Sequence, residues 1–354
     1  MLIPKTLKKG DKIAVVSLSS GMLGDPEFIH KYEIAKSRLE NDFGLEVIPM
    51  THALSGSEFI YNHPEARAAD LMAAFEDDSI KGIICAIGGV DSIRILPYID
   101  YEVISQNPKV FLGYSDSTVG HLIMNKAGLA SYYGVTLIVE FGEYVKMFDY
   151  TKESFEKMIL QEGKGWQIKS SPTWSKDFVP WGSENVHIQK ELIPDTHGYE
   201  ILQGKGVVKG EILGGCLDVF PMCIGTEIWP SKEGWEGKIL FIETSENKIS
   251  PELLSYYLRN LGAQGILEVI QGILVGKPQD EAYYEEYKEM YLKILKEFNR
   301  EDLPVLYNLN VGHAYPTGVL PFGTMVEVDF NRGAIVLIKS ATSSRIMQVL
   351  RATN

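Results

Sequence analysis

Short apolar runs and helical patterns alternate along the first 130 residues of the chain. The apolar runs have the length of buried strands and end at turn residues, and they cover residues 12–20, 44–50, 82–89 and 109–115. Each run is followed by apolar residues at helical spacing, at residues 25–41, 64–76, 91–99 and 116–125. Four strand–helix units in succession predict an N-terminal α/β domain with a doubly wound, mainly parallel sheet.

Two loops of this predicted sheet have sequences suited to a ligand site. In an open parallel sheet, the loops that follow the carboxyl ends of the strands form the ligand crevice. The loop "AIGGVDS" at 86–92 follows one strand, and "GYSDST" at 113–118 follows the next strand. We therefore expect these two loops to be neighbours in space.

The pattern changes beyond residue 163. A helix predicted at 150–162 is followed by residues 163–186, which contain Gly, Pro, Ser and three tryptophans without clear periodicity. The chain then carries predicted strands at 206–215, 238–245, 272–278 and 304–313, helices near 215–224, 251–261 and 280–298, and a hairpin at 324–338 whose turn is "NRG". This pattern predicts a smaller, mixed α/β C-terminal domain at 191–354, joined by a linker at 164–190 to an N-terminal domain at 1–163.

Composition narrows the class of protein. A chain of 354 residues exceeds what one hydrophobic core normally holds, and 45% hydrophobic with 23% charged residues is the balance of a globular protein. The net charge of −13 and the lack of a Lys/Arg block argue against nucleic acid as a partner. No apolar run suits a signal segment or a membrane span, so we expect a cytoplasmic protein without a membrane partner. Cys85, Cys216 and Cys223 form no C-x-x-C pair, so neither a disulfide framework nor a cysteine-rich metal site is expected.

Ser115 stands where the strand at 109–115 turns into a helix. A hydroxyl at such a turn is exposed at the sheet edge, beside free N–H groups of the helix N-terminus that stabilise an oxyanion. Ser, Asp and Thr are also preferred helix N-caps, and "SDST" contains all three. The stretch alone therefore leaves two interpretations open, a nucleophile and a helix cap.

Three further segments bear on the nucleophile interpretation. Gly88 and Gly89 allow the backbone to approach a ligand closely, although no phosphate-binding glycine motif is present. A serine nucleophile needs a base, and the base usually needs an orienting carboxylate. His313 ends an apolar strand within "NVGHAYPTGVLPFG", a loop rich in Gly and Pro that is suited to holding one side chain; a buried structural histidine is the alternative. Glu243 ends the strand "GKILFIETSE", with Glu246 as a nearby competitor for the same role.

Taken together, "GGVDSIRILPYID" with "FLGYSDST", then "GKILFIETSE", then "NVGHAYPTGVLPFG" resemble the LD-carboxypeptidase family of serine peptidases. The order Ser, Glu, His along the chain is also that of the family. The resemblance implies a triad at the interface of two domains, with Ser115 as nucleophile, His313 as general base and acid, and Glu243 as orienting carboxylate. It further implies oxyanion donors at the backbone N–H groups of Gly89 and Asp116, a homodimer, and no metal or organic cofactor.

Within the family, "SPTWSKDFVPWGSENV", "GGCLDVF" and "ETSENKISPELLSYYLRNLGAQGIL" resemble the branch that contains the microcin C immunity protein. That resemblance implies cleavage between an aminoacyl group and a nucleotide-like moiety whose base stacks on Trp181, ahead of Trp174. The alternative is that these tryptophans only pin the linker to the surface. Gly88 and Cys216 would border the substrate, but Cys216 stands where many members have Asn in "GGNL" and supplies no amide there.

Three functions stay open at this point. The first is a serine hydrolase that cleaves an amide-type bond in a peptidyl- or aminoacyl-nucleotide, and the second is a murein LD-carboxypeptidase that removes a terminal D-alanine. The third is a non-catalytic protein that binds a small ligand in an interdomain crevice.

Overall fold

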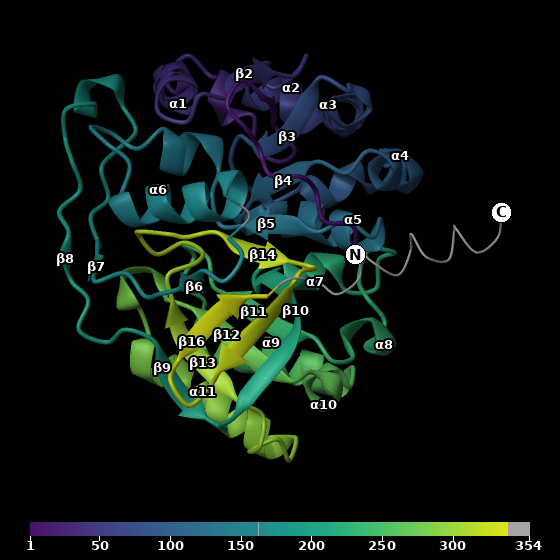
Figure 1. Cartoon of the computed structure of the whole chain (residues 1–354), viewed down its shortest axis with the longest axis vertical. Helices are drawn as coiled ribbons and strands as arrows, with labels where there is room; N and C mark the ends of the chain where they lie inside the picture. The colour runs from purple at the N-terminus through teal and green to yellow at the C-terminus, as the bar shows by residue number, and fades with distance from the viewer. Residues whose placement is uncertain (162, 339–354) are drawn as a thin grey trace.

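The computed structural model describes residues 1–161 and 163–338. Its two larger sheets belong to two parts of the molecule, with the N-terminal half of the chain above and the C-terminal half below in Figure 1. The ends of the predicted helix at 150–162 and of the predicted C-terminal domain lie outside the described residues.

The first sheet has the parallel core that the sequence pattern predicts. Its strand order is β14-β5-β4-β3-β1-β2, and every neighbouring pair except β14–β5 is parallel. The strands are β1 Lys12–Val16, β2 Glu46–Pro49, β3 Ile80–Cys85, β4 Val110–Gly113, β5 Ser131–Tyr133 and β14 Leu320–Phe322. The four predicted strands correspond to β1, β2, β3 and β4, whereas β5 and β14 are too short to produce a recognisable apolar run.

Helices cover both faces of the first sheet. They are α1 Ile29–Asn41, α2 Ser57–Asn62, α3 Pro64–Glu76, α4 Tyr101–Gln106 and α5 Thr118–Lys126, with 3₁₀ turns at Met22–Gly24, Ser92–Tyr98 and Ser115–Ser117 and a π-helical turn at Leu137–Phe141. Ala14 of β1 packs into the cluster that contains side chains of α3 and α5, whereas the next residue, Val15, packs with side chains of α1. Because both faces are buried under helices, the sheet is doubly wound, as predicted.

The linker is mostly irregular and attaches to other parts of the chain through short strands. After α6 Asp149–Phe155 and a π-helical turn at Glu156–Leu160, the chain runs from the upper to the lower part along the left of Figure 1. In this region β6 Gln167–Ile168 joins β16 Ala334–Leu337, and β7 Thr173–Trp174 pairs with β8 Ile193–Pro194. Edge pairing therefore orders a segment whose sequence shows no periodicity.

The second sheet is mixed, as predicted. Its order is β6-β16-β15-β10-β11-β12-β13-β9, with β10 to β13 parallel and the flanking strands antiparallel. The strands are β9 Glu200–Gln203, β10 Val207–Cys216, β11 Ile239–Glu243, β12 Gly272–Gly276, β13 Val305–Leu309, β15 Met325–Asp329 and β16 Ala334–Leu337. With eight strands against six, this sheet is the larger of the two, because the short strands β6 and β9 extend it beyond the strands predicted from sequence.

The helices of the second part are α7 Phe220–Cys223, α8 Lys232–Trp235, α9 Pro251–Ala263, α10 Ile266–Val269 and α11 Tyr284–Glu297. Helix α9 starts where its sequence indicates, because Ser250 Oγ accepts a hydrogen bond from Leu253 N–H at 3.2 Å and Pro251 occupies the first turn. The helix predicted near 215–224 is shorter than expected. Strand β10 continues through Cys216 to pair with β11, which leaves only α7 for the helix.

The two parts of the molecule share strands and hydrophobic core. Strand β14, from the C-terminal part of the sequence, pairs with β5 of the first sheet and lies between the two parts in Figure 1. One hydrophobic cluster joins Ile84 and Leu112 of the first sheet to Phe241 and Leu309 of the second. Shared packing of this kind fixes the loops of one sheet against the loops of the other.

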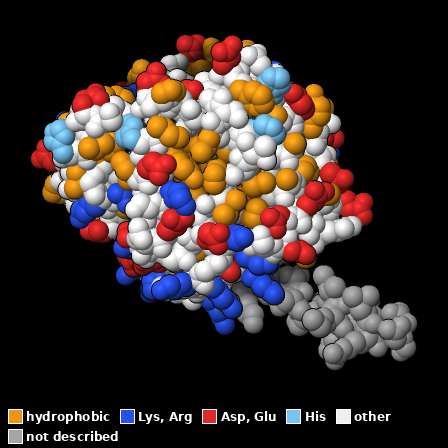
Figure 2. Space-filling view, turned by 90° about the horizontal axis from the view of Figure 1, so that it is seen from above, with side chains coloured by type: hydrophobic (Ala, Val, Ile, Leu, Met, Phe, Trp, Pro, Cys, Tyr) orange, Lys and Arg blue, Asp and Glu red, His pale blue; other side chains and the backbone are white. Residues whose placement is uncertain are grey.

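The outer face of the N-terminal part has a mixed character. Figure 2 shows hydrophobic side chains near the centre of this face, with acidic and basic side chains around them. Within residues 1–161 and 163–338, no helix is both long and apolar enough to cross a membrane.

Candidate active site

Ser115 begins the 3₁₀ turn that follows β4 and leads into α5. Its backbone φ is +62°, in the left-handed region that a residue with a Cβ atom rarely adopts. The 3₁₀ turn and α5 both begin without a side-chain N-cap hydrogen bond. The helix-cap interpretation of "SDST" therefore finds no support, and the strained turn needs another explanation.

Asp116 ties three loops together at this turn. Its buried Oδ2 accepts hydrogen bonds from Ser19 Oγ at 2.5 Å and from Ser92 N–H at 2.8 Å, and it also contacts Ser92 Oγ. Ser19 follows β1, and Ser92 ends the loop after β3. One carboxylate thus holds the loops after β1 and β3 against the turn after β4.

The glycine loop after β3 contacts Ser115, as the sequence predicts. A Cβ atom at Gly88 would lie 2.7 Å from Ser115 Cβ and 2.8 Å from its Oγ, so only glycine fits. Gly89 has a φ of +147°, which also favours glycine. Within the described chain, no hydrogen bond from the N–H of Gly89 or of Asp116 to another group is found. Both N–H groups thus have the freedom that an oxyanion donor needs.

Glu243 and His313 form a buried pair. Glu243 is the last residue of β11, and His313 lies in the loop after β13. Glu243 Oε2 lies 2.7 Å from His313 Nδ1 and 3.3 Å from its backbone N. This hydrogen bond fixes the imidazole orientation and places the proton on Nδ1, which leaves Nε2 as the nitrogen for chemistry.

Tyr133 connects this pair to the turn at Ser115. Its hydroxyl donates to Glu243 Oε1 at 2.6 Å and accepts a hydrogen bond from Ser115 N–H at 3.1 Å. Sequence reasoning missed Tyr133, because a tyrosine in the short strand β5 carries no local signal of such a role. The bridge joins the backbone of Ser115 to the pair of Glu243 and His313.

Two glycines make room for the carboxylate of Glu243. A Cβ atom at Gly276 would lie 2.6 Å from Glu243 Cβ. One at Gly312 would lie 2.6 Å from Glu243 Oε2, and Gly312 also has a φ of +114°. The glycine that precedes His313 therefore serves the close approach of the carboxylate.

Glu246 occupies the other imidazole nitrogen. Its Oε2 lies 3.1 Å from His313 Nε2, although 64% of its side chain is exposed. Burial by itself lowers the pKa of His313, but the charge and hydrogen bond of Glu243, together with Glu246, outweigh burial and raise the pKa to about 10. Among the described residues, no hydrogen bond joins Ser115 Oγ to His313. Glu243 and Glu246 thus do not compete for the same role, since Glu243 binds Nδ1 of His313 and Glu246 binds Nε2.

Cys216 lies beneath this network and has no exposed surface. Its N–H donates to Thr118 Oγ1 at 3.0 Å, and its Sγ lies 3.7 Å from Asp218 Oδ2. Ligand-type atoms of Cys216, Glu243 and His313 all lie within 4.8 Å of one another. Metal binding requires a thiolate, but burial and then the charge of Glu243 raise the pKa of the Cys216 thiol well above its usual range. The donor set, with Cys216 held as a neutral thiol beside the Glu243–His313 pair, therefore suits a hydrogen-bonded cluster better than a metal centre.

Trp181 packs against the N-terminal part of the molecule. The Lys31 ammonium lies 4.4 Å from the centre of its ring, and Phe28 meets the ring edge-on at a centroid distance of 6.4 Å. Trp174 is buried elsewhere, with Lys277 Nζ 4.7 Å from its ring centre. Of the two tryptophans, Trp181 is the one that is only half-buried and retains surface for a ligand.

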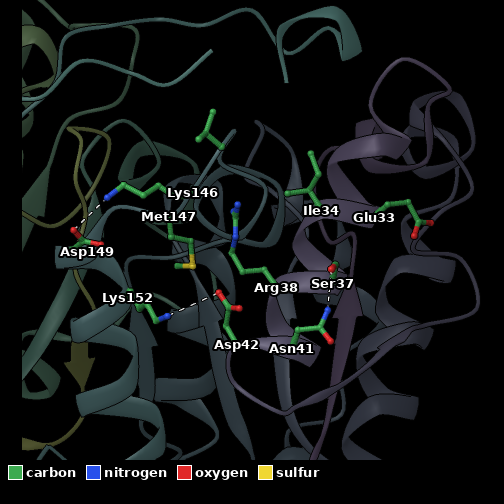
Figure 3. Close-up of a pocket in the computed structure, with 11 residues that line it drawn as sticks. Glu33, Ile34, Ser37, Arg38, Asn41, Asp42, Lys146, Met147, Asp149 and Lys152 are labelled. Atoms are coloured by element: carbon green, nitrogen blue, oxygen red, sulfur yellow. Dashed lines mark hydrogen bonds and ion pairs between the residues drawn. The ribbon is translucent and has the colours of Figure 1, made fainter. Parts of the chain in front are cut away.

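A separate pocket of about 690 Å³ opens between α1 and residues 145–152. As Figure 3 shows, four of its charged groups form two ion pairs: Lys146 Nζ lies 3.5 Å from Asp149, and Lys152 Nζ lies 3.9 Å from Asp42. The lining residues do not include Ser115, Glu243 or His313. The pocket is thus distinct from the candidate catalytic network.

Comparison with known proteins places this arrangement among the peptidases. Residues 13–134 match the family model described as LD-carboxypeptidase N-terminal domain, and residues 209–328 match that described as LD-carboxypeptidase C-terminal domain. The fold and the matched residues thus define a two-domain α/β peptidase. A homologue from Vibrio cholerae serotype O1 is 30% identical and covers 94% of this chain and 96% of its own. The chain belongs to the LD-carboxypeptidase family.

Relatives with different names share this family. The microcin C7 self-immunity protein MccF of Escherichia coli is 29% identical over 78% of this chain and 79% of its own. The Bacillus subtilis protein named "Probable murein peptide carboxypeptidase" is also 29% identical, over 92% of this chain and 91% of its own. Sequence identity to these two proteins does not separate their activities.

Solved structures of similar proteins contain nucleotide ligands. An MccF-like protein from Streptococcus pneumoniae in complex with AMP has a TM-score of 0.85 and 37% identity, and covers 93% of this chain and 98% of its own. The microcin C7 self-immunity protein MccF in complex with aspartyl sulfamoyl adenosine has a TM-score of 0.82 and 26% identity, with coverage of 97% and 100%. These neighbours bind small nucleotide-type molecules.

Proposed function

We propose that the chain is a serine peptidase in which Ser115 is the nucleophile, His313 the general base and then acid, and Glu243 the orienting carboxylate. The observation that carries this proposal is the buried network in which Glu243 contacts His313 Nδ1 at 2.7 Å and reaches the Ser115 backbone through Tyr133. A strained serine at a strand-to-helix turn, with a base and an orienting carboxylate folded onto it, is the arrangement that nucleophilic catalysis requires.

The reaction would proceed by acyl transfer through Ser115. Its Oγ attacks the acyl carbon while His313 Nε2 takes the proton, and Glu243 stabilises the imidazolium that forms. The N–H groups of Gly89 and Asp116 receive the developing oxyanion, a contribution of about 10²–10³ in rate for one donor. His313 then protonates the leaving nitrogen, and it activates the water that hydrolyses the acyl-enzyme.

We infer that the substrate is a peptidyl- or aminoacyl-nucleotide, in which the acyl carbon is joined to the nucleotide part through an amide-type bond. The nucleotide ligands of the similar structures support this class. Trp181 offers a ring for the base to stack on, with Gly88 beside the acyl group. Lys31 already contacts the Trp181 ring at 4.4 Å, so a bound base would share the aromatic surface with this cation.

A second candidate is removal of a terminal D-alanine from a murein tetrapeptide, and the similarity to the probable murein peptide carboxypeptidase of Bacillus subtilis supports it. Both reactions use the same triad, so the triad does not decide between them. They differ in the leaving group, which is a nucleotide derivative in one case and an amino acid in the other.

A panel of two substrates with identified products tests the proposal. An aminoacyl-sulfamoyl adenosine and a murein tetrapeptide are incubated with the wild-type protein, Ser115→Ala and the control Ser105→Ala, and products are identified by mass spectrometry. We expect the wild type and Ser105→Ala to cleave the nucleotide derivative, and Ser115→Ala to lose more than about 10³ of the rate. Full hydrolysis by Ser115→Ala would contradict the triad, whereas cleavage of the tetrapeptide alone would favour the second candidate.

The role of Trp181 has a separate test with the same panel. We expect Trp181→Ala to raise KM for the nucleotide derivative about tenfold, because base stacking contributes on the order of 1–3 kcal/mol. The Trp174→Ala variant, in which a buried linker tryptophan is removed, serves as the control. An unchanged KM in Trp181→Ala would mean that Trp181 only attaches the linker to the protein surface and does not bind the base.

A further inference from the structure

Glu246 occupies the position at which the proposed reaction needs a free imidazole nitrogen. Its Oε2 lies 3.1 Å from His313 Nε2, on the side of the ring opposite to Glu243. The general base must accept the Ser115 proton at this same nitrogen. A nitrogen that donates a hydrogen to a carboxylate cannot accept one, so the arrangement observed is a resting state that must open before the reaction.

Glu246 is placed to leave His313 at little cost. It lies on the turn between β11 and α9, and 64% of its side chain is exposed, so water can solvate the carboxylate once it departs. The neighbouring Lys248 does not hold it, because the Lys248 ammonium pairs with Asp280 at 2.5 Å. Glu243, in contrast, is buried and has hydrogen bonds on both oxygens. Of the two carboxylates, Glu246 is therefore the mobile one.

A positively charged group of the substrate is the partner that would draw Glu246 away. In a productive complex the acyl carbon lies about 3 Å from Ser115 Oγ, and Oγ lies about 3 Å from His313 Nε2. An α-amino nitrogen is two bonds, about 2.5 Å, beyond the acyl carbon, which puts it within roughly 8 Å of Nε2. The carboxylate of Glu246, already 3.1 Å from Nε2, is within side-chain reach of that position.

We propose that Glu246 recognises the free α-ammonium group of the acyl residue, and that forming this ion pair releases His313 Nε2 for proton transfer. Glu246 is thus a specificity residue that couples recognition of the substrate to activation of the base. The inference rests on the proposed serine peptidase function and narrows its substrate class to acyl residues with a free α-amine. A residue whose α-nitrogen is in a peptide bond carries no charge there and leaves Glu246 on His313.

The test compares two substrates that differ only at the α-nitrogen. An aminoacyl-sulfamoyl adenosine and its N-acetyl derivative are assayed with the wild type, Glu246→Gln, Glu246→Asp and the control Glu252→Gln, an exposed glutamate on α9. We expect the wild type and Glu252→Gln to prefer the free amine about tenfold in kcat/KM, the size of one partly exposed ion pair with its released base. Glu246→Gln should lose this preference, and Glu246→Asp should restore part of it.

The pH profile separates recognition from a structural role. In Glu246→Gln, His313 keeps Glu243 but loses the second carboxylate, so the acid limb of kcat/KM should move to lower pH for the N-acetyl substrate. A variant that is merely misfolded would lower the rate without moving this limb. An unmoved limb together with an unchanged amine preference would overturn the inference.

Failure of the inference and failure of the proposed function give different results. Equal cleavage of both substrates by the wild type overturns the role of Glu246 but is still consistent with the proposed serine peptidase function. If neither substrate is cleaved, the titration of His313 is followed by NMR in Ser115→Ala with and without an aminoacyl amide. A shift of that titration to lower pH, absent in Ser115→Ala/Glu246→Gln, supports the role of Glu246 while the nucleotide function fails; no shift overturns both.

Discussion

Tyr133 donates its phenolic hydrogen to Glu243 Oε1 at 2.6 Å, and the phenolic oxygen of Tyr133 accepts a hydrogen bond from the Ser115 N–H at 3.1 Å. One side chain of the first sheet thus joins the carboxylate of the second sheet to the turn that carries the candidate nucleophile. We expect Tyr133→Phe to lower kcat/KM about 10- to 100-fold, because a buried carboxylate loses a hydrogen bond of roughly 1.5–3 kcal/mol.

Steady-state kinetics with urea unfolding as a parallel measurement checks the Tyr133 prediction. Tyr307→Phe is the matched control, because the Tyr307 hydroxyl is also buried but donates to the Tyr284 carbonyl, at 3.0 Å. The control should lose stability without a comparable loss of kcat/KM. An equal loss of rate in both variants would mean that tyrosine burial, and not the bridge, matters.

Removing the side chain of Ser115 should separate stability from activity. Its φ of +62° costs about 1–2 kcal/mol for a residue with a Cβ atom, and glycine avoids this cost. We expect Ser115→Gly to be about 0.5–1 kcal/mol more stable than Ser115→Ala, after the larger entropy of the unfolded glycine chain is subtracted. Both variants should lose labelling by a serine-directed fluorophosphonate. Equal unfolding free energies would show that the turn relaxes in solution.

Gly88→Ala should disable the site more than it destabilises the fold. The added Cβ would meet Ser115 Oγ at 2.8 Å, which forces either the glycine loop or the turn at Ser115 to move. We expect kcat to fall at least about 10²-fold, with a stability loss of about 1–3 kcal/mol from overpacking. Gly234→Ala on α8 is the control, since its Cβ would meet only Pro230 Cβ, at 2.9 Å. Full activity in Gly88→Ala would mean that the reaction does not take place beside Gly88 and Ser115.

The pair of Glu243 and His313 should make stability depend on pH in the alkaline range. The pKa of His313 is raised to about 10 in the folded protein from 6.5, so the charged pair stabilises the fold fully below about pH 6.5. This contribution is lost as the pH rises through about 10. We expect the difference in unfolding free energy between the wild type and His313→Gln to shrink from pH 6 to pH 10.

Urea unfolding at steps of one pH unit measures that difference. His187→Gln, which changes an exposed linker histidine, corrects for the general effects of removing an imidazole. Its difference from the wild type should stay constant over the same range. A constant difference for His313→Gln as well would mean that the imidazole is neutral in the folded protein at neutral pH.

Several features of the fold and site follow from local sequence. Apolar runs of strand length alternate with helical spacing, and each run is long enough to identify β1 to β4 and β10 to β13. The loops with Gly88 and Ser115 are recognisable for the same reason, since they directly follow such strands. Glu243 stands out because it ends an apolar strand, His313 because it closely follows one, and Gly312 marks the close approach of the carboxylate.

Other features depend on contacts between residues far apart in the chain. Strand β14 joins the first sheet although its three residues come from the last part of the described chain, and short edge strands have no pattern of their own. The Tyr133 bridge spans 110 residues to Glu243, and a hydroxyl reveals its acceptor only once the sheets are packed. The place of Cys216 beneath the network, with no exposed surface, is likewise a result of packing.

The sequence by itself determined the α/β class and the parallel first sheet, and it singled out Ser115, Glu243 and His313 as candidates, because period, strand ends and glycine positions are local properties. Only the tertiary structure decided that Glu246 holds His313 Nε2, that Tyr133 joins the two sheets, and that Asp116 binds neighbouring loops in place of capping a helix. These roles are set by distances across the interface between two sheets, and such distances exist only after the hydrophobic core has fixed one sheet against the other.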